Sequence, residues 1–272
     1  MSIYSDLNLA QRLERLEGVA CRRFVEARTK VDPASGACWM EAAGALAMFD
    51  RPSSPVTQTF GLGMWQPVTA AVLDELEAFF FSRGAAVHHE VSPLAGVEVH
   101  ALLAERGYKP IELTSVLYRP AGEPLGGAVN PRIAVRRIGL DESKLWSEIS
   151  ARGWATEHPE LMDFLRDFGG VIGAKADSIS FLAWIDGLPI AAGSMNVGEG
   201  AVLLAGASTV PEGRRQGAQF ALLDARLRYA GAHGCDLAMM GATPGSSSQR
   251  NAERHGFRIA YTRVKWSLGL RG

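Results

Sequence analysis

The chain has 272 residues, of which 47% are hydrophobic and 21% are charged, which is typical of a globular protein with room for two modest domains. Its formal net charge is -1, and it contains no run of five or more like charges. These values argue against nucleic acid and against an anionic membrane surface as partners, because both are bound through concentrated positive charge.

The cysteines and the N-terminal segment indicate a reducing compartment. Cys21, Cys38 and Cys235 are odd in number and widely spaced, which fits neither a disulfide framework nor a C-x-x-C metal or redox motif. Charged side chains interrupt the first sixteen residues, so the apolar core of a signal peptide is missing. No stretch reaches the eighteen uncharged apolar residues of a membrane helix. We therefore expect a cytoplasmic protein without a bound metal.

The first expected element is an amphipathic helix. Apolar residues recur at helical spacing from Leu7 to Phe24, and either Ser5 or Asp6 precedes them as a cap for the first turn. Further along, the segment between Tyr118 and Ile133 is rich in proline and glycine and lacks a periodic apolar pattern, which predicts a linker. We expect a first domain, a linker and a second domain at residues 1–120, 121–131 and 132–272.

The second domain is predicted to alternate strands and helices. Its expected elements are, in chain order, a strand at Ile133–Arg136, a helix at Glu142–Arg152, strands at Ser180–Ile185, Pro189–Val197 and Ala201–Val210, a helix through Phe220 that stops near Gly234, a strand at Leu237–Met240, a helix from about Ser247 to His255, and one or two strands between Phe257 and Trp266. Short glycine-containing turns join the three middle strands, which predicts an antiparallel meander. The expected fold class is mixed α/β.

Short strings of the first half recur about 148 residues later. Residues 104–109 resemble residues 252–258, and Leu73-Asp74 matches Leu223-Asp224 within a predicted helix that ends at glycine. The repeat predicts two related domains, each with a mostly antiparallel mixed sheet flanked by helices.

Residues 208–219 carry the clearest chemical signal, because they lie between a predicted strand and a predicted helix. Unpaired backbone N–H groups at a helix start, together with the helix dipole, favour an anion. Gly217 lets the backbone approach a diphosphate, and Arg214 and Arg215 supply positive charge beside it. The sequence contains neither a P-loop nor a complete dinucleotide fingerprint, so another pyrophosphate-bearing cofactor is indicated.

This loop resembles the pyrophosphate loop of the GNAT acetyltransferase superfamily, whose pattern is Q/R-x-x-G-x-G/A after a strand that ends in valine and proline. Residues 248–257 resemble the family's later helix, which ends in Gly-Phe. The resemblance covers about Arg132 to Leu268 and implies an acyl-CoA-dependent N-acyltransferase domain. The residues that it implies for binding acetyl-CoA are Ser208, Thr209, Val210, Arg214, Arg215, Gln216, Gly217, Ala218, Gln219, Ser248 and Asn251. For the last two, helix capping and a polar helix face are the alternative.

Two positions depart from the family pattern. Gln219 stands where the family has glycine or alanine, so its side chain must either turn away from the cofactor or contact it. Ala252 stands where many relatives place a tyrosine as general acid. Tyr261 or Tyr229 is a candidate for that role, with packing as the alternative.

A base is needed only to remove a proton from the acceptor ammonium, because a neutral amine can attack a thioester directly. Glu157 and His158 are the candidates, since the corresponding segment often lines the acceptor pocket in the resembled family. The alternative is a solvated loop.

The first domain has lost the loop chemistry. If the repeat is real, Met64–Thr69 takes the place of Arg214–Gln219, and Pro67 replaces the glycine and removes an N–H donor. We expect a degenerate copy that packs against the active domain or shapes the acceptor site, with a ligand-free scaffold as the alternative.

The leading functional hypothesis is acetyl transfer from acetyl-CoA, as co-substrate, to a small-molecule or protein amine. Nucleic acid, membrane and metal are not expected as partners, and a homodimer is left open. A module that senses acyl-CoA without turnover is the second hypothesis, because the expected tyrosine is absent. A purely structural pair of folds is the third, and the retained loop argues against it.

Overall fold

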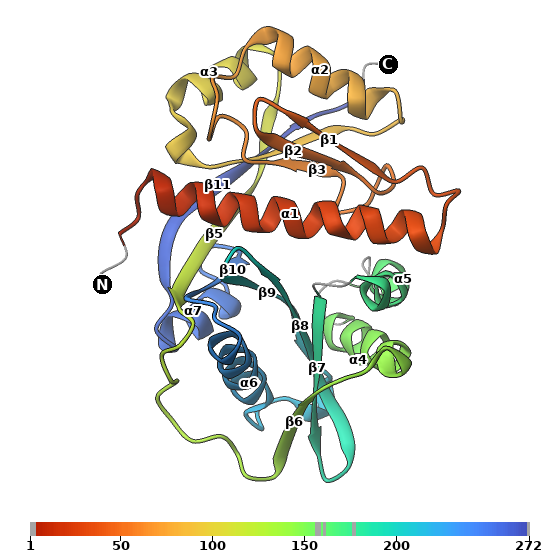
Figure 1. The fold of residues 1–272 in the computed structure, drawn as a ribbon, viewed down its shortest axis with the longest axis vertical. Helices are drawn as coiled ribbons and strands as arrows, with labels where there is room; N and C mark the ends of the chain where they lie inside the picture. Colours follow the sequence, from red (N-terminus) through yellow and green to blue (C-terminus); the bar gives the residue numbers. More distant parts are fainter. Residues whose placement is uncertain (1–3, 156–158, 160–161, 176–177, 271–272) are drawn as a thin grey trace. The chain divides into compact units, whose positions relative to one another are not determined.

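The computed structural model of the protein describes residues 4–155, 159, 162–175 and 178–270. It divides into two compact units: the first joins Met1–Tyr118 to Gly241–Gly272, and the second is Arg119–Met240 (Figure 1). The expected boundaries placed Gly241–Gly272 in the second domain, whereas the structure groups this segment with the first unit.

The first unit contains a mixed sheet with the strand order β1-β2-β3-β4-β11-β5. Its elements are α1 (Leu7–Val31), β1 (Cys38–Ala42), β2 (Ala45–Phe49), β3 (Gln58–Phe60), α2 (Ala70–Phe81), β4 (Val87–Val91), the short 3-10 helix η1 (Pro93–Ala95), α3 (Val97–Glu105), β5 (Lys109–Pro120), α7 (Ser247–Arg254) and β11 (Arg258–Leu268). Strands β3 and β4 are parallel, and the other pairs that we describe are antiparallel.

The C-terminal strand β11 lies between β4 and β5 and is antiparallel to both. Lys265 is opposite Glu90 on one side and opposite Glu112 on the other. The sequence left open whether one or two strands close the chain, and the structure has one. In this position β11 forms backbone hydrogen bonds with β4 on one side and with β5 on the other. Without it, the facing edges of both strands would have unpaired backbone groups.

Helix α1 covers one face of this sheet, while α2 and α3 lie on the other (Figure 1). Alternation along β2 explains both layers: Ala45, Ala47 and Phe49 join the core under α2 and α3, and Leu46 packs close to Gly18 of α1. Of the two candidate caps for α1, the structure uses Asp6, whose carboxylate accepts from the Leu9 N–H at 2.9 Å.

The second unit contains a sheet with the strand order β10-β9-β8-β7-β6. Its elements are β6 (Ile133–Arg137), the 3-10 helix η2 (Leu140–Glu142), α4 (Ser143–Trp154), α5 (Met162–Ala174), β7 (Ser178–Ile185), β8 (Leu188–Gly198), β9 (Ala201–Thr209), the 3-10 helix η4 (Pro211–Gly213), α6 (Ala218–Ala232) and β10 (Leu237–Ala242). Strands β6 to β9 form an antiparallel meander and β10 runs parallel to β9, so the predicted meander is confirmed.

Helices α4 and α5 cover one face of the second sheet, and α6 covers the other (Figure 1). Trp146 of α4 is buried against the strands, with 1% of its surface exposed. The sequence prediction missed α5, although Leu165, Phe168 and Ile172 recur on it at helical spacing. Among the described residues, no helix is long and apolar enough to cross a membrane.

Candidate functional site

Strands β9 and β10 pair over only a short length before they separate. Their parallel register joins Ala201–Leu203 to Leu237–Met239. Beyond Leu203, β9 continues to Thr209 without a described β10 partner. The second half of β9 therefore has a backbone edge that β10 does not cover, and it leads directly into the predicted pyrophosphate loop.

A β-bulge lies where β9 begins this uncovered run. Ala192 is opposite Ser208 and Ser194 is opposite Ala205, so β9 carries one more residue than β8 between these two pairs. Gly206 occupies the extra position with a φ of 60°, a left-handed conformation that favours glycine. The bulge turns the end of β9 and thereby sets the direction in which Thr209 enters the loop.

The loop ends at the start of α6 in a geometry that suits an anion. Gly217 is the N-cap residue, has a φ of 89°, and provides no side-chain cap. The N–H groups of Ala218 and Gln219 in the first turn have no intrahelical acceptor, as in any α-helix. The loop backbone is also held by a residue outside the loop, because the Asn130 side-chain amide donates to the Gln216 carbonyl at 3.0 Å.

Charge and a second helix border the loop. Arg214 and Arg215 are both exposed, and Arg214 also donates to the Gly153 carbonyl at the end of α4 at 3.3 Å. Glu212 forms an ion pair with Arg152, which engages the one carboxylate in the loop. The loop therefore presents positive charge next to open N–H donors.

The side chains of Ser208, Thr209 and Gln219 are engaged by the protein itself. The Ser208 hydroxyl donates to the Ser150 carbonyl at 3.1 Å, and the Gln219 amide donates to the Thr209 hydroxyl at 2.8 Å. Gln219 thus spans from the first turn of α6 to the end of β9. This contact accounts for the departure from glycine or alanine at this position, because the side chain has a partner within the site.

The other predicted site residues lie elsewhere in the chain. Ser248 is exposed and Asn251 is partly buried, and both belong to α7 in the first unit. The residue that caps α7 is Ser246, whose hydroxyl accepts from the Gln249 N–H at 3.1 Å. Tyr261 is also in the first unit, on β11, where its buried hydroxyl donates to Glu14 at 2.7 Å. Glu157 and His158 lie outside the described residues.

Sequence reasoning overlooked Gly153, which lets α4 approach the end of β9 closely. A Cβ atom here would lie 2.5 Å from the Ser208 hydroxyl and 3.0 Å from the Thr209 nitrogen. The sequence offered little signal for it, because the expected helix ended at Arg152 and a glycine just beyond a helix end is usually a C-terminal cap.

The segment that the sequence repeat matches to this loop, residues 64–69 of the first unit, has a different local structure. Helix α2 is capped by Thr69, whose hydroxyl accepts from the Val72 N–H at 3.3 Å. Met64 is buried, and Trp65 packs so closely on Gly61 that a Cβ there would lie 2.4 Å from the ring. The start of α2 is therefore capped by a side chain, whereas the start of α6 is not.

Within the described part of the chain, no group of three or more His, Cys, Asp or Glu side chains is placed to hold a metal ion.

Comparison with known proteins finds similarity in structure only. No family model matches the sequence, and neither does any curated protein. A GCN5-related N-acetyltransferase from Kribbella flavida aligns with a TM-score of 0.68 at 15% identity, over 95% of both chains. One from Sphaerobacter thermophilus has a TM-score of 0.56 at 15% identity, over 87% of this chain and 76% of that one. A tandem GNAT protein from the clavulanic acid biosynthesis pathway has the same score and identity, over 81% and 73%.

The chain therefore has the mixed α/β fold of the GCN5-related N-acetyltransferases, with two such units as in the tandem GNAT protein. The expected fold class is confirmed.

Proposed function

We propose that the chain is an acyl-CoA-dependent N-acyltransferase and that its donor, with acetyl-CoA as the leading candidate, binds along β9 and at the start of α6. The observation that carries this proposal is the start of α6 at Gly217, with a left-handed backbone and no capping side chain. The corresponding helix α2 is closed by Thr69. An uncapped helix start beside exposed arginines matches a pyrophosphate in shape and in charge.

The remaining groups fit the chemistry of direct attack. The uncovered backbone edge of β9 at Ser208 and Thr209 offers hydrogen bonds to the pantetheine arm, whereas the Val210 N–H already donates to the Ile190 carbonyl of β8 at 3.0 Å. A neutral amine would attack the thioester carbonyl, the new C–N bond would replace the C–S bond, and the ammonium proton would leave to a base as the CoA thiolate departs. Backbone N–H groups suffice to stabilise the oxyanion that develops on the carbonyl oxygen.

Glu157 and His158 remain our candidates for the base that accepts this proton. Tyr261 would have to release its hydrogen bond to Glu14 before it could protonate the leaving thiolate. We therefore propose a reaction that does not require a tyrosine acid. The acceptor is a small-molecule or protein amine, and the spacing of Cys21, Cys38 and Cys235, which fits no disulfide framework, supports a cytoplasmic setting.

The test of CoA binding compares two glycines of the same helix. Gly217→Ala should weaken CoA binding by at least about tenfold, because its methyl group intrudes where the diphosphate approaches the backbone. Gly234, just beyond the other end of α6, has a similar φ of 78°. A Cβ atom at Gly234 would have no neighbour within 4 Å, and one at Gly217 would have a single neighbour at 3.9 Å. Gly234→Ala therefore has the same backbone strain without touching the loop. Calorimetric titration with CoA would measure both variants, and equal affinities would contradict the site.

Three further substitutions rank the contributions of the two loops to CoA binding. Gly217→Pro should abolish CoA binding and Pro67→Gly should leave it unchanged, because only the first removes an N–H donor from the proposed site. Arg215→Ala should fall between them, with a loss of about 1.5–3 kcal/mol if a charge-assisted hydrogen bond disappears. Release of free thiol from acetyl-CoA with a panel of amines then separates an enzyme from a sensor, which would bind CoA without turnover.

A further inference from the structure

Three side chains donate to backbone carbonyl groups at the β8–β9 bulge. The Trp146 indole N–H donates to the Gly193 carbonyl at 3.2 Å. The Arg226 guanidinium donates to the Ser194 carbonyl at 3.1 Å. The Ser194 hydroxyl donates to the Ala205 carbonyl at 3.2 Å, and Arg226 approaches the same oxygen at 3.5 Å. The bulge is therefore held from α4 on one face of the sheet and from α6 on the other.

Arg226 is an unusual residue for this position. It is buried, with 4% of its surface exposed, and among the described residues no charged neighbour contributes to the shift of its pKa. Burial lowers the pKa of its guanidinium to about 10. An unpaired charge is costly to bury, so packing alone does not explain an arginine where a leucine or methionine would fill the space.

The contacts of Arg226 explain what it does there. Its Nε donates to the Leu222 carbonyl one turn earlier in α6, at 3.2 Å, which fixes the side chain against its own helix. The guanidinium lies flat on Gly193, where a Cβ would be 3.4 Å from the Cζ atom. Arg226 therefore connects α6, whose start forms the proposed pyrophosphate site, to the strand pair that carries the bulge.

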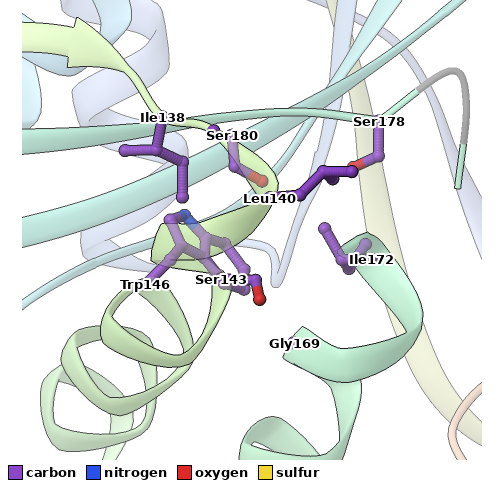
Figure 2. Close-up of a pocket in the computed structure, with 9 residues that line it drawn as sticks. Ile138, Leu140, Ser143, Trp146, Gly169, Ile172, Ser178 and Ser180 are labelled. Carbon is purple, nitrogen blue, oxygen red and sulfur yellow. The ribbon is translucent and has the colours of Figure 1, made fainter. Parts of the chain in front are cut away.

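Trp146 completes the arrangement from the opposite face. Its ring lines a small pocket with Leu140, Ile172 and Ser180 (Figure 2). The cavity volume is about 40 Å³, which has room for water but not for an amine substrate. The contact that Trp146 makes beyond this pocket is its hydrogen bond to the Gly193 carbonyl, and the role that this contact supports is to hold the bulge.

We propose that Arg226 is a positioning residue that holds the β8–β9 bulge and thereby aligns the backbone of β9 with the thioester. This proposal rests on the proposed function, because β9 borders the donor only if acyl-CoA binds there. Arg226 itself is buried under the strands and touches the backbone rather than the substrate. Its removal should disturb the position of the reacting carbonyl more than the affinity for the pyrophosphate.

The test compares Arg226→Met and Arg226→Lys with Arg228→Met. Arg228 lies two residues further along α6, is 75% exposed, and pairs only with Asp224 among the contacts that we describe, so its loss controls for a change of charge on the helix. Hydrogen exchange of the β9 amides from Leu203 to Thr209, kcat and the KM for acetyl-CoA would be measured for all three. Arg226→Met should speed exchange of these amides and lower kcat by about tenfold or more, with KM for acetyl-CoA within about threefold of the parent.

Arg226→Lys keeps the charge but cannot reach the carbonyls of Leu222 and Ser194 together, so it should give intermediate exchange and intermediate kcat. If Arg226→Met does not fold, the proposal is tested by comparing β9 exchange and kcat between Arg226→Lys and Arg228→Met. Exchange of β9 that is equal in the variants of Arg226 and Arg228 would overturn the proposal. A different result would overturn the proposed function alone. In that case β9 exchanges faster in the Arg226 variants than in Arg228→Met, but the parent protein neither binds CoA nor releases thiol from acetyl-CoA.

Discussion

Glu14 is a buried carboxyl group whose protonation should influence stability. It lies on α1 with 1% of its surface exposed, accepts from the Tyr261 hydroxyl, and is 3.5 Å from the Arg263 guanidinium. Glu17 and Glu90 share the same arginine at 2.7 and 2.9 Å. Burial raises the pKa of Glu14 to about 7, although Arg263 opposes the shift.

Glu14→Gln should therefore remove a pH dependence from the first unit. The folded pKa of about 7 exceeds the ordinary value of 4.5, so the stabilising effect of the proton is complete below pH 4.5 and is lost as the pH rises through 7. The loss should amount to about 3 kcal/mol in the free energy of unfolding. Urea unfolding of parent and variant at pH 5 and pH 8 measures it. An equal change with pH in both proteins would show that Glu14 does not bind this proton.

Tyr261 gives a second prediction at the scale of single residues. Tyr261→Phe removes the donor to Glu14 and should lower the free energy of unfolding by about 1–3 kcal/mol, because a buried acceptor loses its partner. The kcat for acyl transfer should stay within about threefold of the parent if no tyrosine acid is required. A fall of a hundredfold or more in kcat, with unchanged CoA affinity, would instead identify Tyr261 as the general acid.

At the scale of elements, α4 makes a close contact with the end of β9 beside the proposed site. Gly153 lies where the helix meets Ser208 and Thr209, and its carbonyl accepts from Arg214 of the loop. The end of α4, the end of β9 and the loop are therefore in direct contact. A substitution that displaces the end of α4 should also displace the loop.

Gly153→Ala should lower the free energy of unfolding by about 1–3 kcal/mol, because the new methyl group overlaps Ser208. It should also weaken CoA binding, because β9 must move away from α4. Gly170→Ala in α5 is the matched control, since a Cβ there meets nothing within 4 Å and alanine favours a helix. Thermal unfolding and CoA titration would compare the two. A Gly153→Ala protein as stable as the control would exclude the close contact.

At the scale of the whole molecule, the C-terminal segment completes the N-terminal unit. Strand β11 pairs with both β4 and β5, and Tyr261 and Arg263 on it reach the buried carboxylates of the first unit. The last elements of the chain therefore have a long-range role that their sequence position does not reveal.

A chain that ends at Gly245 should lose the cooperative folding of the first unit. Removal of β11 leaves edges of β4 and β5 unpaired and Glu14 and Glu90 without Arg263, so aggregation and rapid hydrogen exchange of β4 and β5 are expected. Exchange mass spectrometry of the shortened and full-length chains tests this. Protection of β4 that equals the parent's would mean that the first sheet closes without β11.

Local patterns in the sequence were sufficient for much of the fold and for the loop. The glycine turns predicted the meander from Ser180 to Val210, which the structure forms from Ser178 to Thr209, and the sequence around Gly217 predicted the helix start that α6 has. Both depend on neighbouring residues, which the sequence displays directly. Local sequence likewise reduced the candidates for the cap of α1 to Ser5 and Asp6, and the structure shows that Asp6 is the cap.

The tertiary structure decided every feature that joins distant residues. It placed β11 in the first sheet, matched Tyr261 with Glu14 across 247 positions, and positioned Arg226 beneath the bulge. The sequence determined that β11 is a strand but not which strands it pairs with. Backbone N–H and C=O groups are nearly identical in every strand, so they do not specify a pairing partner. Strand pairing is selected by the burial of whole faces, and burial depends on segments that are far apart in the chain.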